Sequence, residues 1–329
     1  MEDIMILVTG ATGHLGNTLV RLLLDLGESV RVMLCPGETT HSLEGLAVER
    51  VFGDVLDVNS VTRAVTGVHT VYHLAGLISI RGRNELMQRV NVEGARNVAS
   101  IALAKGVSRL VHTSSIHAFR RPDPGGSIDE SAPFDPINPA GDYDRSKAKG
   151  SLEVLEVAKR GLSVVIVCPT GIIGPNDFLG SEMGKTIHNW MNPRRHFMIA
   201  GSFDFVDVRD VAQGMVSAAR FGRPGEVYLL SGTRISLEEI RSRVQREMGV
   251  MKPPFRVGFG VARFCSGIFA PIQRLMGRSS PMTRYAIDTI RDDVPVIRKK
   301  AESELRFRPR RIGESIRSTV AWWKLHPST

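Results

Sequence analysis

Short apolar runs alternate with amphipathic segments along the first two thirds of this chain. Residues 4–8, 29–34 and 164–167 form runs long enough for buried strands, and leucine recurs at helical spacing between residues 15 and 26. This alternation predicts an α/β fold with a doubly wound parallel sheet that carries helices on both faces. In such a sheet, ligands bind beyond the carboxyl ends of the strands.

Three glycines separate the first predicted strand from the first predicted helix. Gly10, Gly13 and Gly16 follow the strand in a Gly-x-x-Gly-x-x-Gly arrangement. Glycines at such a turn let the backbone approach a pyrophosphate, and the helix N-terminus adds free N–H groups and the positive end of its dipole. Strand, turn and helix together predict a dinucleotide-binding unit.

A tyrosine and a lysine lie four residues apart in the stretch YDRSK. Tyr143 and Lys147 would emerge on one face of a helix, because four residues make slightly more than one turn. A phenol has a pKa near ~10, and a neighbouring ammonium favours the phenolate and lowers that pKa. We therefore expect a proton-transfer pair that complements hydride transfer by a nicotinamide cofactor.

The glycine spacing combined with Tyr143 and Lys147 resembles the extended branch of the short-chain dehydrogenase/reductase superfamily. Further stretches match that branch in chain order: GDV from Gly53, HLAG from His73, NVEGARNV from Asn91, TSS from Thr113, CPTGIIGP from Cys168 and FVDVRDVA from Phe205. The pattern is most similar to dihydroflavonol reductases and hydroxysteroid dehydrogenases. The resemblance implies a Rossmann-type NAD(P)-binding domain in residues 1–170 and about 205–230. A smaller, discontinuous substrate-binding region would occupy about 171–204 and 231–329.

The resemblance also implies roles for individual residues. Ser115 would bind the substrate oxygen, and Tyr143 would transfer the proton. Lys147 would hold the nicotinamide ribose, while Asn91 would steady a helix and a water near the lysine. The implied cofactor contacts are Gly10, Thr12, Gly13, His14, Leu15, Gly16, Cys35, Asp54, Val55, Leu74, Ala75, Gly76, Thr113, Tyr143, Lys147, Pro169, Thr170 and Ile172. The implied substrate contacts are Ser115, His117, Leu77 and Gly171.

The residue after the second strand usually distinguishes NAD from NADP. An acid there accepts bonds from the ribose hydroxyls, whereas an arginine binds the 2′-phosphate. This chain has Cys35 at that position, and Arg31 lies four residues earlier. The sequence therefore leaves NAD and NADP open as the cofactor.

Two departures from the family's sugar-nucleotide enzymes bear on the reaction. Family dehydratases carry Asp-Glu after the active serine or threonine, where this chain has Ile116 and His117. Nucleotide-sugar enzymes tend to have asparagine at the position of Gly171. Both departures favour an oxidoreductase that interconverts a hydroxyl and a ketone or aldehyde on an apolar or aromatic small molecule. A nucleotide-sugar epimerase with tightly bound NAD and a non-catalytic NAD(P)-sensing or assembly protein are the alternatives.

Two histidines near this site have separate interpretations. His117 is either an accessory acid or base or a packed loop histidine. His73 ends a predicted buried strand and is expected to be packed and hydrogen-bonded. We expect no metal site, because no Cys/His grouping has metal-ligand spacing.

Cysteine usage and the N-terminus predict a cytoplasmic protein. The cysteines at positions 35, 168 and 265 have no close spacing, which favours reduced thiols. The chain begins with Glu2 and Asp3 and lacks the basic and apolar order of a signal peptide.

The net charge of +9 is concentrated in one part of the chain. Residues 251–329 hold 16 Lys and Arg against 6 Asp and Glu. We expect no nucleic-acid partner, because no nucleic-acid module is present. The basic region and the interrupted apolar stretch 257–276 are compatible with weak peripheral membrane association. The same stretch could instead form a helix pair that lines an apolar substrate pocket.

Local signals also predict helix starts and an interface. Ser236 and Glu239 form a capping box for a helix that runs to Met248, and Asp210 is expected to cap another helix. Helices near 88–105 and 143–160 resemble the pair that forms a four-helix homodimer interface in the superfamily. The apolar side chains there are Leu152, Leu155 and Val157, which could equally pack inside the protomer.

Overall fold

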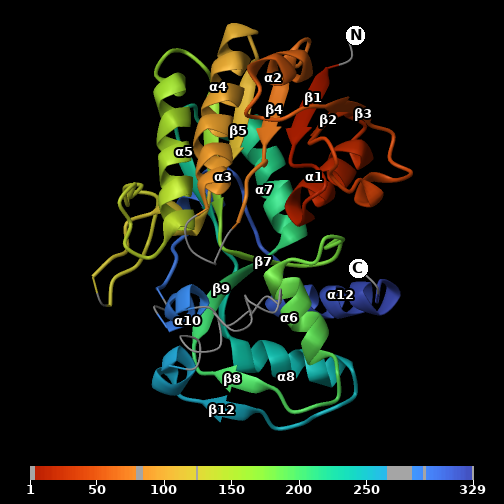
Figure 1. The fold of residues 1–329 in the computed structure, drawn as a ribbon, viewed down its shortest axis with the longest axis vertical. Helices are drawn as coiled ribbons and strands as arrows, with labels where there is room; N and C mark the ends of the chain where they lie inside the picture. The colour runs from red at the N-terminus through yellow and green to blue at the C-terminus, as the bar shows by residue number, and fades with distance from the viewer. Residues whose placement is uncertain (1–3, 79–83, 124, 265–283, 292–293, 328–329) are drawn as a thin grey trace.

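A seven-stranded parallel sheet forms the larger part of the molecule (Figure 1). The computed structural model describes residues 4–78, 84–123, 125–264, 284–291 and 294–327. In spatial order the strands are β10 (Val227–Leu230), β6 (Val164–Pro169), β5 (Arg109–Thr113), β4 (Thr70–His73), β1 (Met5–Thr9), β2 (Ser29–Leu34) and β3 (Glu49–Phe52). All neighbouring strands are parallel, which confirms the predicted α/β class. The order reverses between β1 and β4, where a doubly wound sheet opens a ligand crevice.

Helices cover both faces of this sheet and bury two apolar cores. On one face α1 (His14–Asp25) packs against α7 (Val208–Phe221), with Leu19 and Met215 fully buried between helix and sheet. On the other face lie α2 (Val58–Val65), α4 (Ala95–Ala104) and α5 (Asp142–Ala158). The chain enters α4 through α3 (Glu85–Gln88) and a π-helical segment at Arg89–Gly94. The helices on both faces fix the positions of the strand ends.

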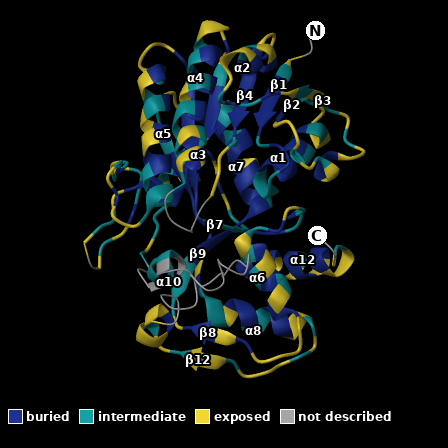
Figure 2. Cartoon of the chain, in the orientation of Figure 1, coloured by how far each residue is buried: buried dark blue, intermediate teal, exposed yellow. Residues whose placement is uncertain are grey.

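A smaller region lies beyond the carboxyl ends of the strands, in the lower part of Figure 1. It contains a three-stranded sheet of β11 (Thr233–Ser236), β9 (Ser202–Asp207) and β7 (Gly171–Ile173), and a pair formed by β12 (Phe255–Val257) and β8 (Phe197–Ile199). The helices α6 (Glu182–Trp190), α8 (Leu237–Glu247), α10 (Arg284–Arg291) and α12 (Ile312–Leu325) surround these strands. Another helix, α11 (Lys299–Glu304), packs near β10. Figure 2 shows a buried interior in both regions, and Trp190, Trp322 and Trp323 belong to the core of the smaller one.

The start of α7 differs from the sequence prediction. Asp207, not Asp210, is the N-cap, and its carboxylate accepts from the backbone N–H of Arg209 at 2.9 Å. Asp210 instead lies in the first turn and accepts from the Arg310 backbone N–H and Nε at 2.7 and 2.9 Å. The prediction was wrong because a distant arginine, which local sequence does not reveal, occupies the Asp210 carboxylate.

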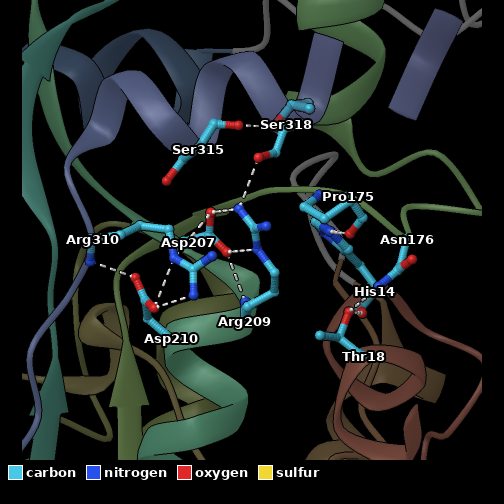
Figure 3. A network of polar contacts seen from close by, with 11 residues as sticks. His14, Thr18, Pro175, Asn176, Asp207, Arg209, Asp210, Arg310, Ser315 and Ser318 are labelled. Atoms are coloured by element: carbon cyan, nitrogen blue, oxygen red, sulfur yellow. Dashed lines mark hydrogen bonds and ion pairs between the residues drawn. The ribbon is translucent and has the colours of Figure 1, made fainter. Parts of the chain in front are cut away.

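The same residues form a polar network that ties α12 to the start of α7 (Figure 3). The Arg209 guanidinium donates to both carboxylate oxygens of the buried Asp207 at 2.9 and 2.8 Å and reaches Ser318 Oγ of α12 at 3.0 Å. Nearby, His14 at the start of α1 is bonded through Nε2 to the Pro175 carbonyl oxygen at 2.9 Å. These contacts fix the smaller region relative to the glycine turn.

The second helix-start prediction is confirmed. Ser236 is the N-cap of α8, and its Oγ accepts from the Glu239 backbone N–H at 3.1 Å. The helix ends at Glu247, with Met248 as its C-cap.

Two further predictions concern surfaces. Of the side chains considered for an interface, Val157 is buried and Leu155 packs against the core, whereas Leu152 is 37% exposed. Residues 265–276 of the apolar stretch lie outside the described residues. Among the residues that the structure describes, no helix combines the length and apolarity needed to cross a bilayer.

Candidate active site

The glycine turn between β1 and α1 is built around close backbone contacts. Gly10 has a φ of +71°, and a Cβ there would lie 2.7 Å from the Ala75 backbone nitrogen. A Cβ on Gly16 would overlap the Gly10 carbonyl. Gly13 is different, because its nearest neighbour would be the Gly10 carbonyl oxygen at 3.5 Å. Gly10 and Gly16 are therefore required by packing, while Gly13 leaves open the side from which a pyrophosphate would approach.

The N-terminus of α1 is suited to binding an anion. Its N-cap is Gly13, which offers no side-chain cap, and its first turn contains no acidic residue. The free N–H groups of a helix N-terminus and its positive dipole end favour a bound phosphate. The glycine turn and this helix end together fit the pyrophosphate of a dinucleotide.

The end of β2 holds an acid that sequence reasoning missed. Glu38 accepts from the Cys35 backbone N–H at 2.9 Å and from the Thr12 hydroxyl of the glycine turn. Arg31 turns away, because its guanidinium donates to Glu49 at 2.9 Å and to a backbone carbonyl of Thr66 at 2.7 Å. In the sequence, the signal for this acid was Glu38 itself, which lies three residues after Cys35, the expected position.

The other expected cofactor contacts lie at neighbouring strand ends. Leu74 and Ala75 follow β4, and their backbone N–H groups donate to Thr9 O and Thr9 Oγ1, each at 3.2 Å. The remaining positions surround the same edge of the sheet: Asp54 and Val55 after β3, Leu15 in α1, Gly76 after β4, Thr113 in β5, Pro169 in β6, Thr170 between β6 and β7, and Ile172 in β7. The fold thus gathers segments that are far apart in the chain.

His73 confirms the expectation of a packed, hydrogen-bonded histidine. It is buried, and its Nδ1 lies 2.8 Å from Thr9 Oγ1. Burial, helped by the nearby Lys147 charge, lowers the pKa of His73 to about 3. In the described part of the chain, no cluster of three or more His, Cys, Asp or Glu side chains has the arrangement of a metal site.

Lys147 reaches across to the end of β5. Its Nζ donates to the Thr113 carbonyl oxygen at 2.6 Å, and the residue is 9% exposed. Burial disfavours the ammonium and lowers the pKa of Lys147 to about 8. A cation in this place also lies near Gly76, where an added Cβ would be 3.8 Å from Nζ.

The pKa of Tyr143 differs from the sequence expectation. Burial raises the pKa of Tyr143 to about 12, and a hydrogen bond with Ser115 is the largest effect that opposes this rise. The expected lowering by Lys147 is absent, because loss of hydration dominates and the lysine is bonded to Thr113. At neutral pH Tyr143 is therefore a neutral phenol, the form that a proton donor needs.

Asn91 connects the loop after β4 to helix α5. It accepts from the Leu77 backbone N–H at 2.8 Å and donates to the Leu77 carbonyl at 2.9 Å and to Ser146 Oγ at 2.8 Å. Leu77 therefore uses its backbone to hold the loop, while its side chain is partly exposed. Asn91 positions α5, the helix that carries Tyr143 and Lys147.

A small pocket opens next to Ser115. Its wall combines the apolar side chains of Ile116, Ile128, Phe203, Val294 and Val296 with the polar side chains of Arg121, Asp204 and Thr289. His117 and Thr170 also line it, although the Thr170 hydroxyl is taken up by Asp204 at 2.6 Å. Gly171 packs elsewhere, since a Cβ there would lie 2.8 Å from the Phe205 ring. Of the expected substrate contacts, His117 is among the described residues that line this pocket.

Comparison with known proteins agrees with this geometry. Residues 6–231 match the model of the NAD dependent epimerase/dehydratase family. The chain belongs to that family. It is 36% identical to sterol demethylase protein B of Methylococcus capsulatus, over 97% of this chain and 98% of that protein. It is 28% identical to a putative dihydroflavonol 4-reductase of Synechocystis sp., over 97% of this chain and 94% of that protein.

A solved structure extends the likeness to the whole fold. The crystal structure of gox2253 has a TM-score of 0.85 and 28% sequence identity, and the match covers 99% of both chains. The family description is NAD-dependent, and the open Gly13 side and uncapped α1 fit such a cofactor. The protein is thus an NAD(P)-dependent oxidoreductase of the extended short-chain type.

Proposed function

We propose that this protein uses NAD to interconvert a hydroxyl and a ketone on an apolar, sterol-like molecule. The observation that carries this proposal is the group of aliphatic and aromatic side chains in the wall of the pocket that begins after Ser115, a wall to which His117, Arg121, Thr170, Asp204 and Thr289 also contribute. An apolar wall gains by excluding water from a hydrocarbon ligand, whereas a sugar nucleotide needs many polar partners. The name of the relative sterol demethylase protein B supports a sterol-like substrate.

The proposed division of roles rests on the site residues. Bound NAD would supply or accept the hydride. Ser115 would donate a hydrogen bond to the reacting oxygen, and Tyr143 would move a proton at that oxygen. Their mutual hydrogen bond supports this pairing, since one substrate oxygen could reach both hydroxyls. Lys147, held by Thr113, would orient the nicotinamide ribose. Asn91 would keep α5 in place.

The cofactor would be recognised at both ends. We assign the pyrophosphate to the glycine turn and α1, and the adenosine ribose to Glu38. A carboxylate there would accept bonds from ribose hydroxyls and repel a 2′-phosphate, which favours NAD over NADP. The domain boundaries follow from this assignment. Residues 1–170 and about 205–230 would hold the cofactor, and about 171–204 and 231–329 the substrate.

We also propose a cytoplasmic location, a homodimer and weak membrane association. The described cysteines, Cys35 and Cys168, are free thiols, which supports a reducing, cytoplasmic setting. A homodimer through α4 and α5 would use Leu152 as its exposed apolar contact, and light scattering of the purified protein tests it. Weak membrane association through the basic C-terminal part is tested by sedimentation with vesicles that contain anionic lipid.

Replacement of Tyr143 by phenylalanine tests the catalytic assignment. We expect Tyr143→Phe to lower kcat at least about 1000-fold on a ketosteroid, because it removes only the proton donor. The Kd for NADH should stay within about twofold in a nicotinamide fluorescence titration. Tyr72→Phe, in the buried strand β4, is the matched control and should keep its activity. Near-normal turnover by Tyr143→Phe would refute the assignment.

The substrate class needs its own test. Purified protein is assayed with NADH against ketosteroids, small aromatic ketones and nucleotide sugars. Turnover of ketosteroids with stoichiometric NADH oxidation supports the proposal. Conversion of a nucleotide sugar without added cofactor would favour the epimerase alternative, in which tightly bound NAD is regenerated within each cycle.

A further inference from the structure

A buried carboxylate lies beside the proposed catalytic tyrosine and has no role in the scheme above. Asp144 follows Tyr143 directly in α5, and its side chain is fully buried. Its Oδ1 lies 3.4 Å from His117 Nδ1. A buried carboxylate is unfavourable unless a cation or donor compensates it. Its place in the first turn of α5 supplies part of the compensation through the helix dipole, and the His117 imidazole and the Tyr285 hydroxyl are polar side-chain neighbours.

His117 is held from several directions. Its backbone N–H donates to Ser115 Oγ at 3.2 Å, which ties it to the proposed substrate-binding serine. Its ring stacks on Phe203 with centroids 5.8 Å apart and an interplanar angle of 12°. Tyr143 meets the ring edge-on at 6.0 Å. Tyr285 of α10 places its hydroxyl 3.3 Å from Nδ1. The imidazole is therefore fixed in position rather than free in a loop.

The polar contacts of the His117 ring lie at one of its two nitrogens. Asp144 and Tyr285 both address Nδ1, on one edge of the imidazole. His117 also lines the pocket, and its side chain is 16% exposed. Nε2 lies on the opposite edge of the ring from the carboxylate. A histidine whose Nδ1 faces a carboxylate and a hydroxyl has Nε2 as its other nitrogen for a ligand.

We propose that Asp144 orients His117 so that Nε2 hydrogen-bonds a second oxygen of the substrate, next to the reacting one. This inference rests on the proposed function and adds a substrate class to it. The favoured substrate would be an apolar ketone or alcohol with a neighbouring hydroxyl, carbonyl or carboxyl group. His117 is then a specificity-determining residue, and Asp144 is a positioning residue that acts through it.

The test compares two steroid ketones with NADH. One is a steroid 3-ketone with no other oxygen, and the other carries an additional hydroxyl on the carbon next to the ketone. The wild type should prefer the second by its ratio of kcat/KM. His117→Gln and Asp144→Asn should each lower that ratio about tenfold, roughly the effect of one lost hydrogen bond.

A double variant separates positioning from general damage. Because Asp144 is proposed to act through His117, the double variant should lose no more of the ratio than His117→Gln alone. Asp142→Asn is the matched control. Asp142 lies in the first turn of the same helix, but its carboxylate pairs with Arg145. That variant should keep the wild-type ratio, and all variants should bind NADH as the wild type does.

The outcomes distinguish the inference from the proposed function. Failure of the wild type to reduce either ketone would refute the proposed function and the inference with it. Reduction of both ketones with the same ratio in wild type, His117→Gln and Asp144→Asn would overturn the inference alone. Additive losses in the double variant would overturn the positioning role of Asp144.

Discussion

The buried ammonium of Lys147 should lower the free energy of unfolding of this protein. The substitution Lys147→Met replaces the buried ammonium with an apolar side chain of similar length. Burial lowers the pKa of this lysine from 10.5 to about 8, so the folded state holds the proton less tightly than the unfolded chain. Below pH 8 the full penalty is present, and it corresponds to about 3 kcal/mol for a shift of this size.

The net gain in the free energy of unfolding from Lys147→Met is smaller than the cost of burying the ammonium. Methionine leaves the Thr113 carbonyl without the donor that Lys147 Nζ supplies at 2.6 Å. An unsatisfied buried carbonyl opposes the gain by about 1–2 kcal/mol. We therefore expect cofactor-free Lys147→Met to be about 1–2 kcal/mol more stable than the wild type at pH 7, while it loses activity.

The pH dependence identifies the cause. Between pH 8 and 10.5 the unfolded wild type binds more protons at this site than the folded state, so its free energy of unfolding rises with pH. The advantage of Lys147→Met should shrink across that window. Urea unfolding followed by circular dichroism at several pH values measures it. Lys149→Met, on the exposed side of the same helix, is the control and should differ from wild type by less than about 0.5 kcal/mol.

Two results would refute this reasoning. One is a Lys147→Met protein that is less stable than the wild type at pH 7. The other is a stability difference that stays constant from pH 7 to 10.5, since a buried charge cannot produce a constant offset through its own titration.

The remaining predictions concern the cofactor. Gly13→Ala should leave the thermal midpoint nearly unchanged, because the position is open and its φ is −66°, but should raise the Kd for NADH at least tenfold by crowding the pyrophosphate. Gly16→Ala, whose Cβ would overlap the Gly10 carbonyl, should instead destabilise the fold, and equal effects of the two variants on melting would contradict this account. Glu38→Gln should weaken NADH about tenfold and strengthen NADPH in the same fluorescence titration, because a charged acceptor is lost. Glu44→Gln in the following turn is its control, and an unchanged NADH-to-NADPH ratio in Glu38→Gln would remove Glu38 from cofactor selection.

Much of the fold and the order of the site were predictable from the chain alone. The strand Ser29–Leu34 has the predicted bounds, and the helix after the glycine turn begins within one residue of its prediction. These features are local, because apolar periodicity and glycine placement act over a few residues. The placement of the residues after β1 and after β5 at one edge of the sheet also followed, since parallel strands bring their carboxyl ends to one edge.

The tertiary structure decided what depends on distant neighbours. Burial by residues remote in sequence set the pKa of Tyr143, and the local Lys147 did not. The Asp210 carboxylate accepts a hydrogen bond from Arg310, and Asp207 is the residue that caps the helix. Asp144 is part of the stretch YDRSK, but its contact with His117, which lies in another segment, is set by the tertiary structure. Loss of hydration and charge pairing depend on which surfaces meet in space, so the sequence determined the elements and their order, and packing determined their electrostatics.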